Sequence, residues 1–169
     1  MSQLHPPRPP AVAGLFYPAD PAELARSIRA YLAAVVPPGP LGPIKALIVP
    51  HAGYIYSAPI AAAAYRALAD QAQSIRRVIL LGPTHRVAVR GVAVPSVPAF
   101  TTPLGPVAVD DGARQAIADL PQVVINDAPH AQEHALEVQL PFLQTVLDDF
   151  QCLPLAVGQA STAEVAEVL

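Results

Sequence analysis

The chain has 169 residues, of which 53% are hydrophobic and 14% are charged, and this balance excludes an intrinsically disordered protein. Its net charge is −3, and Lys and Arg are scattered along the chain, so there is no basic stripe for a nucleic-acid backbone and we expect no nucleic-acid partner. No apolar run approaches the ~20 residues that a membrane-spanning helix needs, so we expect no membrane partner.

The sequence also indicates a compartment. Residues 1–10, MSQLHPPRPP, lack the apolar core of a signal peptide. The single cysteine, Cys152, lies in the apolar stretch QCLPLAVG and has no partner for an internal disulfide. We therefore expect a cytoplasmic protein in which Cys152 is a small buried hydrophobic residue.

The first half of the chain predicts helices that alternate with buried strands. Residues 20–35 begin with an Asp cap and a Pro and have apolar residues at helical spacing, which predicts a helix that ends before Pro37. Residues 44–50, IKALIVP, are a continuous β-rich run without alternation and predict a fully buried strand. Residues 57–72 predict an alanine-rich helix, and residues 76–85 repeat the earlier pattern of an apolar strand, a Pro and a His.

The second half of the chain predicts shorter elements. In chain order we expect a strand at 91–96, a turn region at 100–106, a strand at 107–110, a helix at 110–120 capped by Asp110, a strand at 122–126, a mostly helical stretch at 134–150 that Pro141 must kink, a strand at 152–158, and a helix that begins after a Ser161 or Thr162 cap.

The alternation of strands and helices predicts an α/β fold with a partly parallel central sheet flanked by helices. We divide the chain into a Pro-rich lead at 1–10 and one α/β domain at 11–169. The last residues, STAEVAEVL, form a helix start without a C-terminal cap signal, so we expect the fold to be incomplete at its C-terminus. A sheet cut there would expose a strand edge, which predicts either a longer chain or self-association.

Two histidines follow the two apolar runs of the first half at matching positions. His51 comes directly after the run that ends at Pro50, in IVPHAGYIYS, and His85 follows the second run, in LLGPTH. If the two strands are parallel and adjacent, both imidazoles emerge at the carboxyl edge of the sheet, where open α/β sheets bind ligands. Two neutral imidazoles there could hold Fe(II), Zn or Cu; the alternative is two ordinary turn histidines.

The segment HAQEHALE carries a second cluster, with His130, Glu133, His134 and Glu137. It contains H-x-x-E-H, the signature of one class of zinc peptidases. On a helix His130 and His134 would share a face as metal ligands, and Glu133 would be the general base. The alternative is a polar helix N-terminus with acidic residues that the helix dipole favours. The peptidase interpretation requires His130 and His134 to point the same way, apart from His51.

Three aromatic side chains near these motifs have two interpretations. Tyr54 and Tyr56 could line a pocket beside His51, although aromatic residues near a strand end more often pack in the core. Phe16 lies in the compact turn AGLFYPAD, which we interpret as packing with a possible contribution to a pocket edge.

Five segments together resemble a known family. PAVAGLFYP, VPHAGYIYS, ILLGPTH, TPLGPVAVD and EHALEVQLPFL have the order and spacing seen in the Memo family, whose bacterial members are often labelled AmmeMemoRadiSam system protein B. The resemblance runs from about residue 11 to Leu169. It implies an α/β fold similar to the catalytic subunit of class III extradiol dioxygenases, with a metal site at a sheet edge.

The resemblance also implies roles for individual residues. His51 and His85 match the two metal-binding histidines of the family, and His134 matches a catalytic histidine that donates a proton or a hydrogen bond in the same vestibule. The implied cofactor is a transition metal, Fe(II) first, with Cu or Zn as alternatives. The family takes its third metal ligand, a cysteine, from a later part of its sequence that is absent here, and Cys152 lies in the wrong place to replace it.

Three functions follow from these residues. The first is a metal-dependent, dioxygenase-like oxidoreductase. The alternative is a non-enzymatic module that binds a peptide or a small-molecule ligand in the same vestibule, and the third is the zinc peptidase. Whether the chain is an enzyme stays open at this point.

Overall fold

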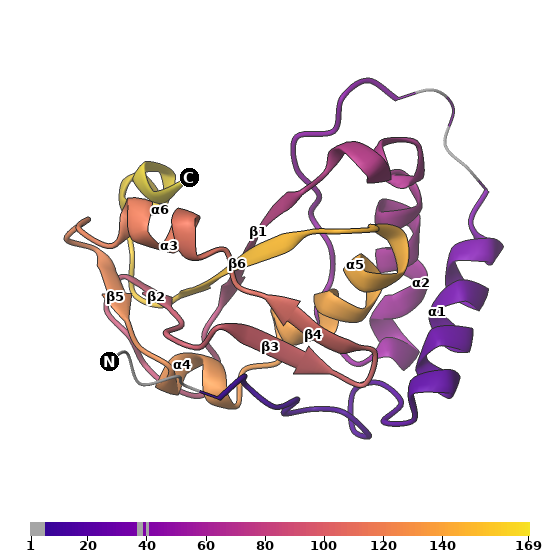
Figure 1. The fold of residues 1–169 in the computed structure, drawn as a ribbon, viewed down its shortest axis with the longest axis horizontal. Helices are drawn as coiled ribbons and strands as arrows, with labels where there is room; N and C mark the ends of the chain where they lie inside the picture. Colours follow the sequence, from indigo (N-terminus) through magenta and orange to yellow (C-terminus); the bar gives the residue numbers. More distant parts are fainter. Residues whose placement is uncertain (1–5, 37–38, 40) are drawn as a thin grey trace.

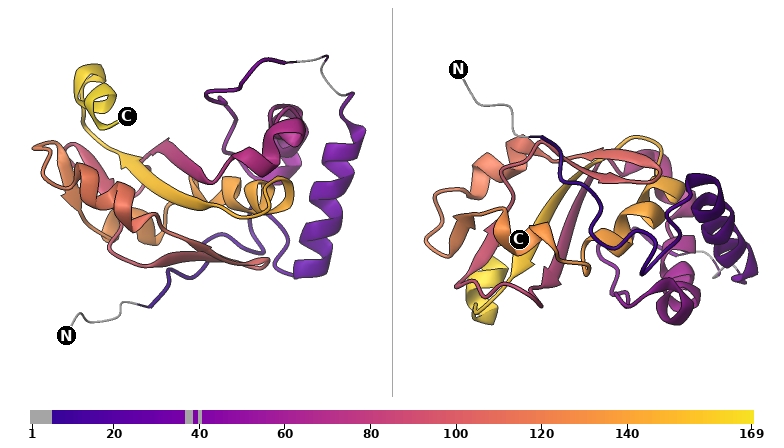
Figure 2. Two further views of the ribbon diagram at one scale, coloured as in Figure 1. Left: turned by 45° about the horizontal axis from the view of Figure 1, so that its top comes forward. Right: turned by 90° about the horizontal axis from the view of Figure 1, so that it is seen from below.

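The computed structural model describes residues 6–36, 39 and 41–169 and has the predicted α/β architecture (Figure 1). The first five residues of the lead, and Pro37, Pro38 and Pro40 after the first predicted helix, lie outside the described residues. Helices α1 (Pro21–Ala34), α2 (Tyr54–Arg66) and α5 (Leu140–Val146) gather at one end of the molecule, and α3 (Asp111–Ile117) and α6 (Thr162–Val168) lie at the other end, as both views in Figure 2 show.

A four-stranded, partly parallel sheet connects the two ends, in the order β1-β6-β2-β5. Strand β1 (Arg77–Pro83) pairs in parallel with β6 (Gln151–Val157), so that Val78 lies opposite Cys152. The short strand β2 (Val92–Val94) runs antiparallel to β6 and parallel to β5 (Val123–Ile125). A separate hairpin joins β3 (Ala99–Thr102) to β4 (Gly105–Ala108).

Three helices begin at the predicted caps. The Asp20 side chain accepts a hydrogen bond from Glu23 N at 2.7 Å at the start of α1, and Asp110 accepts one from Ala113 N at 2.9 Å at the start of α3. Ser161 and Glu164 form a reciprocal capping box at α6. No helix in the described part of the chain is long and apolar enough to span a membrane.

The predicted strand at 44–50 is wrong. The structure describes this whole segment and contains no strand in it, and Ile48 is 99% exposed. Strand β1 pairs only with β6 among the described strands, so the apolar run has no strand partner, although Ile44, Leu47 and Val49 still pack against the core. A short apolar run does not by itself determine its pairing, which depends on residues far away in the sequence.

Other differences concern element boundaries. The predicted helix at 57–72 is α2, which begins earlier, followed by a 3₁₀ helix, η1 (Ala69–Ser74). The predicted turn region at 100–106 contains most of β3 and the start of β4. The predicted helical stretch at 134–150 contains η2 (Glu137–Gln139) and α5, in which Pro141 occupies the first turn rather than kinking a longer helix.

The core packs α1, α2 and α5 against one another, and the same hydrophobic cluster reaches Leu80 of β1 and Cys152 of β6. Leu24 and Ile28 of α1 are fully buried. The Tyr65 ring of α2 stacks on Phe142 of α5 with ring centroids 5.0 Å apart. Cys152 is fully buried in β6, as predicted, and burial raises the pKa of its thiol to about 12. This core fixes the start of α2, and therefore the residues immediately before it.

Candidate metal centre

Three histidines from distant parts of the sequence meet beside the end of β1. The ring centroids of His51 and His85 are 5.4 Å apart, those of His85 and His134 are 4.7 Å apart, and those of His51 and His134 are 5.9 Å apart. One nitrogen from each ring lies within 4.8 Å of the others. The expected meeting of His51 and His85 is therefore confirmed, although His51 arrives from an extended segment rather than from a strand.

Hydrogen bonds fix the two chain segments that carry His51 and His85. Before His51, the carbonyl of Pro50 accepts a hydrogen bond from the Gln139 side chain at 3.1 Å. Helix α2 begins three residues after His51, and Tyr54 N donates to the Phe16 carbonyl at 2.7 Å. Before His85, Thr84 N donates to Val157 O at 3.0 Å, which ties the end of β1 to the end of β6.

The buried carboxylate of Glu133 organises the histidine cluster. Its Oε2 accepts a hydrogen bond from His85 N at 2.6 Å, and its Oε1 lies 2.9 Å from His85 Nδ1 and 3.2 Å from His134 Nδ1. Burial by itself would raise the pKa of Glu133, but hydrogen bonds from Ala135 N and from His85 outweigh burial and keep the pKa below its usual value. Glu133 is therefore an anion, and both Nδ1 atoms face it.

The environment of His134 keeps its imidazole neutral. Burial lowers the pKa of His134, and coulombic repulsion of its protonated form by the neighbouring His85, His51 and Arg86 lowers the pKa further, although the Glu133 carboxylate opposes this shift. The ring of Phe16 packs against it with centroids 4.7 Å apart.

His130 does not belong to this cluster. It is 2% exposed, its Nε2 lies 3.1 Å from the Ala93 carbonyl, and its ring meets Phe100 edge-on. Helix α4 (Ala128–Ala131) ends before His134, so the two histidines do not share a helix face. His134 points instead to His51, and the zinc-peptidase interpretation of H-x-x-E-H is therefore wrong.

An open cavity of about 560 Å³ leads to the cluster. It is lined by Phe16, Pro50, His51, Ala52, Gly53, Tyr56 and His134. Tyr56 is 77% exposed and Tyr54 is buried, so of the two tyrosines beside His51 one lines the cavity and the other packs in the core. Phe16 also lines the cavity, a role that its position in a compact turn indicates only weakly.

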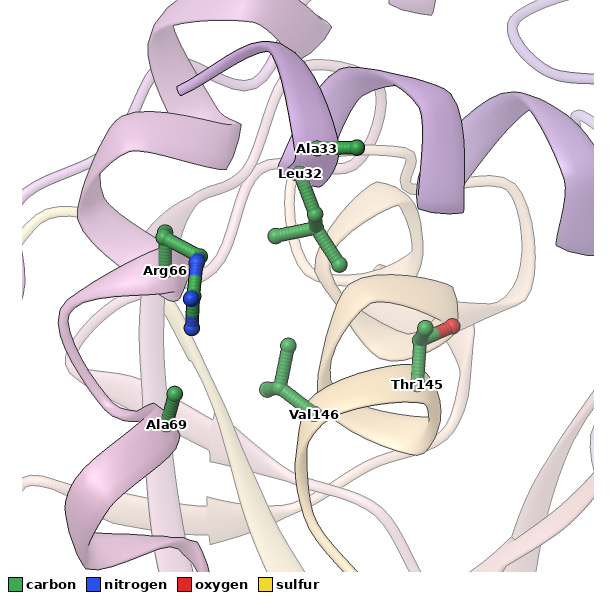
Figure 3. A pocket seen from close by; sticks show the side chains of 6 residues that line it. All are labelled: Leu32, Ala33, Arg66, Ala69, Thr145 and Val146. Atoms are coloured by element: carbon green, nitrogen blue, oxygen red, sulfur yellow. The ribbon is translucent and has the colours of Figure 1, made fainter. Parts of the chain in front are cut away.

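A second cavity, of about 380 Å³, lies among α1, α2, η1 and α5 (Figure 3). Figure 3 shows Leu32, Arg66 and Val146 pointing into it. Its lining contains one cation and no metal-ligating side chain, so it lacks the chemistry of the histidine cluster.

The histidine cluster fits a transition metal. Because Glu133 faces Nδ1 of both His85 and His134, the Nε2 atoms of these rings are free to face an ion. Carboxylate–imidazole pairs of this kind orient metal-binding histidines and increase their basicity. Neutral imidazoles suit Fe, Cu and Zn. Sequence patterns alone did not indicate this role for Glu133, because its distance from His85 along the chain hides the contact.

An α/β fold with imidazoles gathered at the end of a strand defines a class of candidate metal-binding proteins. Within this class, the profile of the Memo family, described as Memo-like protein, matches residues 8–169, and the chain belongs to that family. This membership confirms the resemblance inferred from the five sequence segments.

Curated relatives carry the same family name. A MEMO1 family protein of Ignicoccus hospitalis is 41% identical over 96% of this chain and 60% of its own length. One from Methanopyrus kandleri is 39% identical over 95% of this chain and 60% of the relative. One from Aquifex aeolicus is 40% identical over 89% of this chain and 54% of the relative. The chain thus spans about 60% or less of these relatives.

Proposed function

We propose that this chain carries the histidine half of a transition-metal centre that performs dioxygenase-like oxidation. The observation that supports the proposal is the convergence of His51, His85 and His134, with one nitrogen of each within 4.8 Å of the others, beside an open cavity that His51 and His134 line. His51 and His85 are the proposed metal ligands. His134 is the proposed acid–base group.

The preferred ion is Fe(II), with Cu or Zn as alternatives, because all three accept imidazole ligands. Two histidines leave several coordination positions open, which is what a catalytic rather than a structural site requires. A third protein ligand would come from sequence beyond these 169 residues, as the family resemblance implies. A bound iron or copper ion would supply the redox chemistry between an ortho-diphenol and dioxygen, whereas Zn has no redox chemistry and would serve only as a Lewis acid.

The protein's own groups would position the substrate and move its proton. His134 has a lowered pKa and is neutral near pH 7, so it can accept the proton of a substrate hydroxyl and return it later as an acid. Glu133 would hold the Nδ1 side of His134 and His85 and so keep Nε2 available. Phe16 and Tyr56 would form apolar walls for an aromatic ring.

The first experiment is metal analysis of freshly purified protein, with the variants His51→Ala, His85→Ala and His130→Gln. The proposal expects a transition metal in the wild type, its loss from the first two variants, and its retention in the third, since His130 lies outside the cluster. Wild-type protein without affinity for any of the three metals would contradict the metal centre.

The alternative is a non-enzymatic module that binds a peptide or a small molecule in the same cavity. Its support is the open, largely apolar wall formed by Phe16, Pro50 and Tyr56, which could accept a ligand without chemistry. Oxygen uptake with a panel of catechols separates the two functions. Metal-loaded protein that consumes no oxygen with any catechol would favour the binding module.

A further inference from the structure

A buried arginine joins the N-terminal segment to the loop that carries Glu133 and His134. Arg8 is 5% exposed, although it lies in the Pro-rich lead. Its Nε donates to His130 O at 2.6 Å, and one terminal nitrogen donates to Glu133 O at 2.8 Å. Its guanidinium also lies 4.8 Å from the centroid of the Phe100 ring. One planar group therefore fixes two carbonyls of the loop.

The partner of Arg8 is Glu137, a fully buried carboxylate. Its Oε2 accepts from Arg8 at 2.7 Å and from Ala11 N at 2.8 Å. Its Oε1 accepts from Val12 N at 3.0 Å and from Tyr17 OH at 2.6 Å. Every one of these four donors belongs to residues 8–17. A buried carboxylate that lost them would be left unpaired, so these four hydrogen bonds favour the state in which the segment is docked on the loop.

Residues 8–17 also contact the histidine cluster itself, through Phe16. Phe16 packs against the His134 ring, and its carbonyl accepts a hydrogen bond from Tyr54 N, at the start of the helix that follows His51. The segment runs from beside α4, past the β3–β4 hairpin, to the start of α1 (Figure 1). Residues 8–17 therefore contact both the segment that carries His51 and the loop that carries His134.

We infer that residues 8–17 are a positioning clamp for the metal centre, with the Arg8–Glu137 pair as its anchor. This inference rests on the proposed metal centre and deepens it. When the clamp is docked, Glu133 and His134 lie against His85 and His51 in the geometry that favours an ion. Because coupling between two binding events is reciprocal, metal binding must in turn favour docking of the clamp.

The first test replaces Arg8 by lysine and measures affinity for Co(II), a spectroscopic probe of the site. Lysine keeps the charge, but its single ammonium cannot reach two carbonyls and a carboxylate in one plane. We expect a folded Arg8→Lys variant whose Co(II) affinity is lower by about tenfold or more, as for other residues that orient metal ligands. Its visible Co(II) bands should also change, because the ligand geometry changes.

The matched control is Ile28→Val, which removes one methylene from the fully buried core of α1. It should lower the melting temperature but leave both the Co(II) affinity and the visible spectrum unchanged. An Arg8→Lys variant that binds Co(II) like the wild type would overturn the clamp. Equal weakening by Ile28→Val would overturn it too, since general destabilisation would then suffice.

The second test needs no variant and holds even if Arg8→Lys fails to fold. Amide hydrogen exchange is measured in the wild type with and without Co(II). The clamp predicts that Co(II) slows exchange in residues 11–17 more than in residues 24–32 of α1. Uniform slowing of both peptides would overturn it. Absence of Co(II) binding by the wild type would overturn the metal centre and the clamp together, whereas wild-type binding with uniform slowing overturns the clamp alone.

Discussion

Glu133 and His85 are joined at two points, since the carboxylate accepts a hydrogen bond from the His85 backbone N–H at 2.6 Å and faces its ring Nδ1 at 2.9 Å. One side chain thus fixes both the position and the tautomer of this histidine. The same carboxylate accepts from His134 N at 2.8 Å, which brings the two rings to one site.

Glu133→Gln tests the importance of this carboxylate. The amide keeps the shape but removes the negative charge and replaces one acceptor by a donor. We expect metal affinity to fall by about 10- to 100-fold, the range for groups that orient metal ligands. Co(II) titration measures this affinity. The matched control is Glu164→Gln in the capping box of α6, which should bind Co(II) normally. Unchanged affinity in Glu133→Gln would show that the contact is only structural.

His134→Asn and His85→Asn separate the two proposed roles of the histidines. His85→Asn removes a proposed ligand and should abolish measurable Co(II) binding. His134→Asn should keep most of the affinity, and oxygen uptake with a catechol that the wild type oxidises should fall by about 10²- to 10⁴-fold, the range for a general acid–base group. If His134→Asn instead loses the metal as completely as His85→Asn, His134 is a third ligand.

The meeting of His51 and His85 was predictable because each follows an apolar run and a proline. The path of the chain to His51 was not predictable, because the segment before His51 forms no strand. The pairing of β1 with β6 also joins residues that are far apart in the sequence. The sequence showed that His130 and His134 are close neighbours but not that they diverge. That outcome follows from the end of α4 at Ala131 and from burial of His130.

Long-range polar contacts were the least predictable part of the site. The Arg8–Glu137 pair joins a proline-rich segment to a loop far away in the sequence, and no periodicity or motif signals such a pair. Fold class and helix caps were predictable because they depend on neighbouring residues, as the Asp20 and Asp110 caps illustrate.

Two glycines offer a matched pair of stability predictions. Gly91 has φ +86°, and a Cβ there would lie 2.0 Å from the Gln122 carbonyl oxygen. Gly91→Ala should therefore lower the free energy of unfolding by at least ~2 kcal/mol, from backbone strain and the clash. Gly112 lies within α3, where an added Cβ would make only an ordinary van der Waals contact. Gly112→Ala should therefore raise the free energy of unfolding by ~0.5 kcal/mol. Urea unfolding measures both. Equal effects would contradict the geometry at Gly91.

His130 should make the protein less stable in mild acid. Its pKa falls from 6.5 to about 4, chiefly because of burial; the charge of Arg8 acts in the same direction, and the Ala93 carbonyl, Asp127 and Glu133 oppose the shift. The unfolded chain therefore binds more protons between pH 6.5 and pH 4, so stability is full above this window and is lost as the pH falls through it. The loss attributable to His130 should be about 2 kcal/mol between pH 7 and pH 5.

Urea unfolding at both pH values, for the wild type and His130→Gln, measures this share. Glutamine can still donate to the Ala93 carbonyl but does not titrate, so the variant should lose about 2 kcal/mol less than the wild type over the same interval. The lowered pKa of His134 adds acid sensitivity in the same direction, and it should remain in the variant. A wild type and a variant with the same pH dependence would show that His130 is not held neutral by burial.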